Sequence, residues 1–140
     1  MSVTFNAYNS EKQELVPEGF VQEWEQDPDY GRMRKNVNPW ELNVANSNFV
    51  RLMDLLGSPS EDYCGQWESV GDELSEVLEQ IKFVLQSIEA MPTLDGGVPD
   101  ETVGSVTYCG LHEGYFAERL KQLQAIVEAA IKNNGTVVWS

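Results

Sequence analysis

The sequence is short of positive charge. Its 140 residues include 9 Lys and Arg against 23 Asp and Glu, which gives a formal net charge of -14. A charge of this sign and size repels polyanions, so direct binding to nucleic acid or to an anionic membrane is disfavoured. The partner that this composition favours is a basic protein surface.

Long hydrophobic runs are also missing. No segment approaches the roughly 18 consecutive apolar residues of a membrane-spanning helix. The first residues, Met1–Asn6, carry neither the positive charge nor the apolar stretch of a secretion signal. We therefore expect a cytoplasmic protein that has no membrane partner and keeps its cysteines reduced.

The common short motifs of catalysis and cofactor binding are absent. The sequence contains no P-loop, dinucleotide-binding glycine motif, HExxH motif, EF-hand loop or GxSxG motif. We assign no catalytic residue and expect no cofactor. A non-enzymatic role is favoured, while simple catalysis stays open.

Cysteine and histidine are scarce. Cys109 and His112 have a C-x-x-H spacing, and Cys64 would be a third soft ligand for zinc. Only half of a paired zinc motif is present, so no metal is assigned. Two buried or partly buried reduced thiols are the favoured interpretation, because free cysteine packs as a small hydrophobe.

Apolar residues are plentiful enough to build one core. They make up 41% of the chain, which predicts a single domain over residues 1–140. Residues 1–38 differ in being polar, acidic and rich in loops, and we expect them to wrap around the body. Burial of Trp24 and Tyr30 is expected to pin this wrap.

Apolar periodicity predicts an α+β fold, in which a small antiparallel or mixed sheet packs against three helices. The C-terminal strand is expected to pair with Leu42–Val44. The predicted strands lie near 3–7, 41–45, 104–108 and 136–139, and the predicted helices cover about 47–56, 70–90 and 114–133.

Negative charge is densest between Arg51 and Lys82, where no basic residue occurs. This run is either an ordinary solvated surface or an interaction surface, because carboxylates at helical spacing can imitate the phosphates of a nucleic acid. The acidic face predicted beside the second helix consists of Glu68, Asp72, Glu73, Glu76 and Glu79.

Polar residues cluster where the strand at 41–45 meets the first helix. Asn side chains are good helix caps, which is the simpler interpretation. The alternative is a ligand pocket, in which backbone N–H groups at the start of the third helix would also receive an anion. Its candidate residues are Trp40, Asn43, Asn46, Asn48, His112, Tyr115 and Arg119.

Four groups of residues are informative together: 41–48 with 52–57, 63–65, 114–120 and 137–139. In combination they resemble a group of small uncharacterised bacterial and phage proteins, over roughly residues 38–140. No activity follows from this resemblance. It implies that the Asn junction and Gly114–Leu120 belong to one structural unit.

Three functional hypotheses follow. The first is a protein-interaction or inhibitor module that docks its acidic face on a basic protein, with a phage or mobile-element mimic of nucleic acid as its most specific form. The second is a small-ligand binder or simple hydrolase that uses the pocket between the Asn43–Asn48 junction and His112–Arg119. The third is a structural subunit, for which a homodimer is compatible.

Overall fold

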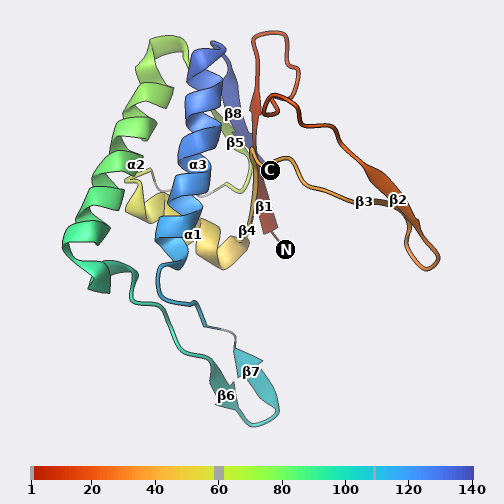
Figure 1. The fold of residues 1–140 in the computed structure, drawn as a ribbon. Coiled ribbons are helices and arrows are strands. Elements are labelled where there is room, and N and C mark those ends of the chain that lie inside the picture. The colour runs from red at the N-terminus through yellow and green to blue at the C-terminus, as the bar shows by residue number, and fades with distance from the viewer. Residues whose placement is uncertain (1, 59–61, 109) are drawn as a thin grey trace.

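A four-stranded antiparallel sheet forms the centre of the protein (Figure 1). The computed structural model describes residues 2–58, 62–108 and 110–140. The strands lie in the order β4-β1-β8-β5, so the two chain ends pair at the middle of the sheet. Their bounds are Ser2–Tyr8 for β1, Glu41–Ala45 for β4, Gly65–Glu68 for β5 and Thr136–Trp139 for β8.

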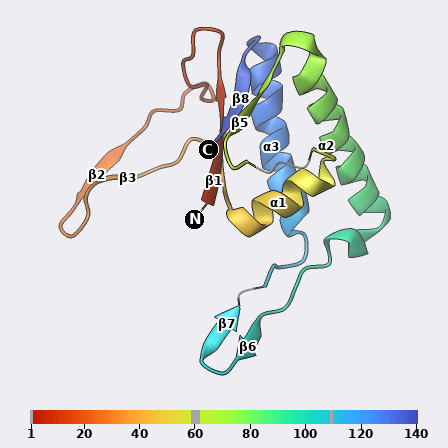
Figure 2. The same cartoon turned by 180° about the vertical axis from the view of Figure 1, so that it is seen from behind.

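Three helices cover one face of this sheet (Figures 1 and 2). They are α1 (Asn46–Leu55), α2 (Glu73–Ala90) and α3 (Tyr115–Lys132). Apolar residues at helical spacing bury one side of each helix, and α2 packs along α3. The α+β fold class predicted from the sequence is confirmed.

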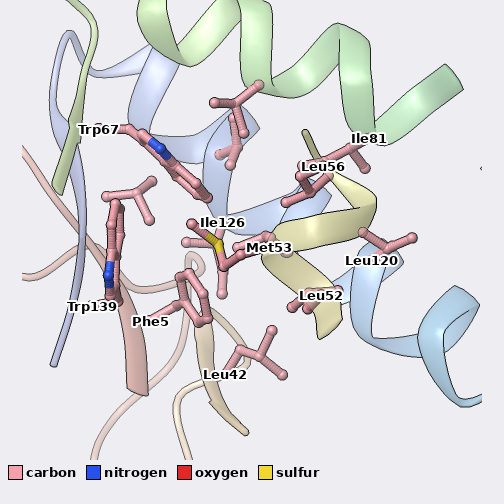
Figure 3. Close-up of a cluster of buried hydrophobic side chains, with 14 of the residues drawn as sticks. Phe5, Leu42, Leu52, Met53, Leu56, Trp67, Ile81, Leu120, Ile126 and Trp139 are labelled. Carbon is pink, nitrogen blue, oxygen red and sulfur yellow. The ribbon is translucent and has the colours of Figure 1, made fainter. Parts of the chain in front are cut away.

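Phe5 lies at the centre of the core, between the sheet and the helices (Figure 3). It is fully buried, as are Val3 and Ala7, because alternate residues of β1 face the helices. Its ring centroid lies 5.8 Å from that of Phe49, 6.1 Å from that of Trp67 and 6.0 Å from that of Trp139. Aromatic packing therefore joins β1, β5, β8 and α1.

The strand pairing differs from the prediction in two ways. The C-terminal strand β8 lies between β1 and β5, and β1 separates it from β4. Strand β5 was not predicted, because a segment as short as Gly65–Glu68 has too few residues to show a period. Gly65 lies opposite Trp139, and a Cβ atom there would come 2.5 Å from Cζ2 of Trp139. Glycine at this position lets the tryptophan ring cross the strand.

The segment predicted as one strand near 104–108 belongs to a hairpin outside the main sheet. Its strands are β6 (Glu101–Val103) and β7 (Val106–Tyr108), which pair with each other. Gly104 has φ +63° at the turn. This hairpin projects beyond the ends of α2 and α3 (Figure 1).

The predicted helix caps are not formed. Ala45 is the N-cap of α1, Asn46 is its first residue, and no side chain caps it. A short 3-10 helix, Val70–Asp72, precedes α2, so that helix begins at Glu73.

A second hairpin projects from the opposite side of the sheet to the helices (Figures 1 and 2). It consists of β2 (Trp24–Asp27) and β3 (Gly31–Arg34), and we call residues 21–37 the arm. The prediction that Trp24 and Tyr30 are buried is wrong, because their side chains are 47% and 81% exposed. The arm extends away from the core, so no apolar surface reaches these rings.

Residues 1–38, predicted as a wrap, include the central strand β1 and the projecting arm, and polar contacts attach the segment between these two elements. The buried amide of Asn38 donates to the backbone oxygen of Leu15 at 3.1 Å and to Glu14 at 3.2 Å. Its side-chain oxygen accepts a hydrogen bond from the backbone N–H of Trp40 at 2.9 Å. The Leu15 N–H donates to the backbone oxygen of Ala7. Residues 14 and 15 are therefore tied to both β1 and the segment that enters β4.

Candidate functional site

The predicted acidic face follows one continuous stretch of chain. Glu68 ends β5, Asp72 ends the 3-10 helix, and the other three carboxylates lie in the first two turns of α2. Among the described residues the ion pairs are Arg34–Glu41 and His112–Glu118, so none belongs to this face. Acidic residues in a first helical turn also suit the helix dipole. The face is therefore an uncompensated block of negative charge.

A recess of about 340 Å³ adjoins this face. It lies between the end of α1, β5 and the start of α2. Glu73 is held at its edge, because its carboxylate accepts a hydrogen bond from the Glu68 backbone N–H at 3.2 Å. The recess is lined by Leu56, Ser58, Trp67, Glu73, Glu76, Val77 and Gln80. Glu73 and Glu76 in the lining suit the charged head of a long cationic side chain, whose apolar stem can lie along the recess.

The second candidate site is a polar cluster between α1 and α3. The Asn48 amide donates to the Tyr115 hydroxyl at 3.2 Å. The Arg119 guanidinium lies 5.1 Å from the centre of the Tyr115 ring, and the His112 ring meets that ring edge-on at 5.5 Å. His112 Nε2 also lies 3.0 Å from a carboxylate oxygen of Glu118. Four of the predicted pocket residues are thus brought together.

Two other predicted pocket residues lie elsewhere. Asn43 points to the outer face of the sheet, because Leu42 and Val44 on either side of it are buried, and its amide donates to the hydroxyls of Ser2 and Thr4. Trp40 packs against the core near the far end of α3, in a recess with Ala129. The residues predicted to line one pocket therefore do not all lie at one site.

The start of α3 already holds a carboxylate. Asp95 is buried, and its two oxygens accept hydrogen bonds from the backbone N–H groups of Phe116 and Ala117 at 3.0 and 2.8 Å. This side chain occupies the position that the sequence assigned to an anionic ligand. It comes from a turn 21 residues earlier, so local capping rules gave no signal for it.

A recess of about 390 Å³ lies beside the polar cluster, between α1 and the base of the β6–β7 hairpin. Asn48, Arg51 and Glu101 line it. Two buried polar atoms have no hydrogen-bond partner within the described part of the chain. They are Oδ1 of Asn46, two residues before Asn48, and Nε of Arg119. Such atoms are costly unless water or a ligand satisfies them.

The zinc hypothesis gains no support. Cys109 lies outside the described residues, and Cys64 is an exposed free thiol, which corrects the expectation that it is buried. Within residues 2–58, 62–108 and 110–140, no group of three His, Cys, Asp or Glu side chains is arranged to hold a metal ion.

The arm carries a feature that sequence reasoning missed. The Arg32 guanidinium lies 4.1 Å from the centre of the Trp24 ring, and Arg34 forms a 2.8 Å ion pair with Glu41 on β4. The hydrogen bond from Arg34 lowers the pKa of the Glu41 carboxyl below its ordinary value, although burial opposes this effect. The available signal was the turn-forming run Asp27–Gly31, because Asp, Pro and Gly between two short segments fit a hairpin.

Comparisons of the chain with protein-family models, with curated proteins and with solved structures found no match. No helix in the described ranges has the length and apolar character needed to cross a membrane.

Proposed function

We propose that this protein is a non-enzymatic interaction module, which uses its acidic face to bind a basic protein. The observation that carries the proposal is the block of five carboxylates that form no ion pair with any described residue, next to a recess lined by Glu73 and Glu76. A lysine or arginine of the partner would place its stem against Trp67 and its charge beside Glu73 and Glu76. Such complementarity favours rapid, specific association.

A partner that normally binds nucleic acid fits this proposal best. Carboxylates on successive turns of α2 present a row of negative charge to a basic groove, as a phosphate backbone does. The mimic would act by occupying that groove. Inhibition of a nucleic-acid-binding protein is the most specific form of the proposal.

The test is charge reversal. The variant Asp72→Lys, Glu76→Lys and Glu79→Lys is used as bait beside the wild type, with captured proteins challenged by duplex DNA. The expected result is a salt-sensitive set of basic proteins that DNA displaces and that the reversed variant fails to capture. The matched control, Glu89→Lys, Glu113→Lys and Glu128→Lys, makes the same change in net charge at exposed positions outside the acidic face.

Equal capture by the wild type and the reversed variant would reject the electrostatic mechanism. Loss of capture in both the reversed variant and the control would also reject it, because net charge and not the acidic face would then govern binding. Circular dichroism of each variant establishes that it is folded before the comparison is made.

A second candidate function is binding of a small polar ligand at the Asn48–Tyr115 cluster. It is favoured by the unpaired buried atoms Asn46 Oδ1 and Arg119 Nε and by the adjoining recess. The measurement is a thermal-shift screen of small polar metabolites with the wild type and Asn48→Ala. A hit that stabilises both proteins equally would place its binding elsewhere.

A further inference from the structure

The arm has little to stabilise it as an isolated element. A two-stranded hairpin in water is marginal unless other structure covers it. Val21 at its base is 71% exposed, and the rings of Trp24 and Tyr30 are also largely in solvent. Trp, Tyr and Arg are the residue types that dominate the binding energy of protein interfaces. The composition of the arm is that of a contact surface.

The register of the hairpin sorts its charges onto two faces. Trp24 pairs with Arg34 and Gln26 pairs with Arg32, so these four side chains lie on the same face. We call them the basic face of the arm. The opposite face carries Glu25, Asp27 and Met33. Segregation of this kind gives a projecting element with one cationic and aromatic side.

The basic face already contacts the outer face of the sheet at one point. Arg34 donates to Glu41, whose side chain is 13% exposed and which also accepts from Asn6. The outer face is the face of the sheet away from the helices. The charged residue of β5 and β8 on this face is Glu68. The ion pair within one chain demonstrates that the two surfaces are chemically complementary.

The far half of the outer face is hollowed. A recess of about 530 Å³ lies over β1, β5 and β8, lined by Tyr8, Gln66, Glu68, Thr136 and Val138 together with residues 9, 10, 12, 134 and 135. The rings and methyl groups of Tyr8, Thr136 and Val138 are half-buried. A recess with apolar walls and a carboxylate matches a tryptophan that carries a stacked guanidinium.

We propose that two copies of this chain form a symmetric dimer by exchanging arms. Each arm lies across the outer face of the other copy, with Trp24 in the recess beside Val138 and Arg32 near Glu68. The arm projects from the face of the sheet away from the helices (Figures 1 and 2), and the recess lies on that face because its lining residues Tyr8, Thr136 and Val138 alternate with buried ones. A two-fold axis would then repeat the contact and close the assembly. The contact covers the exposed aromatic rings of both arms.

One residue opposes this contact. Lys12 lines the same recess and repels the approaching Arg32. Its removal is therefore informative, since Lys12→Glu is expected to tighten the dimer, whereas a variant that merely damages the fold would weaken it.

Sedimentation velocity over a wide range of protein concentrations tests the proposal. The wild type is expected to show a monomer–dimer equilibrium, and Trp24→Ala to raise its Kd by roughly tenfold or more. Arg32→Glu and Glu68→Lys are each expected to weaken the dimer, and their combination in one chain to restore it. Lys121→Glu is the control, because this exposed lysine lies on α3, which covers the other face of the sheet.

Monomer at every concentration would overturn the proposal. A dimer that is insensitive to Trp24→Ala, or a double charge swap that is weaker than either single change, would overturn it as well. The result is separable from the proposed binding of a basic protein, because reversal of Asp72, Glu76 and Glu79 leaves Glu68 and the arm intact and should leave the dimer unchanged.

Discussion

The four-stranded sheet and the arm are both antiparallel β-structure, yet different forces hold them. Trp67 and Trp139 in the sheet are buried with ring centroids 4.7 Å apart, whereas Trp24 in the arm lies in solvent under a guanidinium. Apolar burial stabilises the sheet, and side-chain hydrogen bonds and one ion pair stabilise the arm. The chain therefore combines a closely packed body with a projecting hairpin that keeps little apolar burial of its own.

The largest expected effect comes from removing the ring at the centre of the core. Phe5→Ala deletes contacts with three other aromatic rings and leaves a cavity, so we expect a loss of about 3–5 kcal/mol in the free energy of unfolding. Urea unfolding followed by circular dichroism measures it. Tyr30→Ala, an equal truncation in the arm, should cost far less, and similar losses for both variants would break the distinction between the two regions.

A smaller effect is expected where backbone and ring meet in the sheet. The new methyl group of Gly65→Ala would lie 2.5 Å from the buried Trp139 ring. We expect a loss of about 1–3 kcal/mol, because the ring or the strand must shift. Gly96→Ala is the control, since its methyl group would meet the Thr93 backbone oxygen at 3.3 Å. Equal decreases in melting temperature for the two variants would argue against the close contact between the Gly65 backbone and the Trp139 ring.

The attachment of the arm should depend on pH. The Arg34 hydrogen bond lowers the folded-state pKa of Glu41. The ion pair therefore contributes stability above the unfolded-state pKa of this carboxyl, and that contribution is lost as pH falls through the folded-state value.

Glu41→Gln is the variant that tests this attachment. Arg34 is 42% exposed, so solvent screening limits the expected loss at neutral pH to about 0.5 kcal/mol. Amide exchange in the arm and denaturant unfolding would measure it, and the difference from wild type should vanish in acid. The control Glu18→Gln alters an exposed carboxylate of the wrap. A difference that grows in acid would contradict the assignment.

An equally small effect on stability is expected at the arm itself. Trp24→Ala removes an exposed ring and its contact with Arg32, so the free energy of unfolding of the monomer should change by only about 0.5 kcal/mol. Dilute protein in chemical denaturation provides the measurement. A loss of unfolding free energy as large as that of Phe5→Ala would show that Trp24 is part of the core. The arm and the sheet would then not differ in how they are stabilised.

Prediction from the sequence succeeded where a period repeats over several residues. The apolar stripe of α2 and the alternation of Val3, Phe5 and Ala7 each state which side faces the core. It failed for β5, which is too short to show a period, and for the hairpin at Glu101–Tyr108, where a turn at Gly104 divides a segment that was predicted in part as one strand.

The candidate sites were predicted unevenly for the same reason. The acidic face was found because its carboxylates are close in sequence. The meeting of Asn48 with Tyr115 joins residues 67 positions apart, and the cap that Asp95 provides to α3 also spans a long interval. Side-chain direction decided the exclusion of Asn43, which points outward between two buried neighbours.

By itself, the sequence determined the α+β class, the three helices, the excess of negative charge and its concentration near the start of α2. These properties depend on composition and on local periodicity, both of which can be read within a single segment of the chain. Only the tertiary structure decided that β8 lies between β1 and β5, that Asp95 fills the start of α3, and that the arm presents Trp24 and Arg32 together. Those outcomes depend on contacts between distant segments, whose energies are set by packing and burial once the chain has folded.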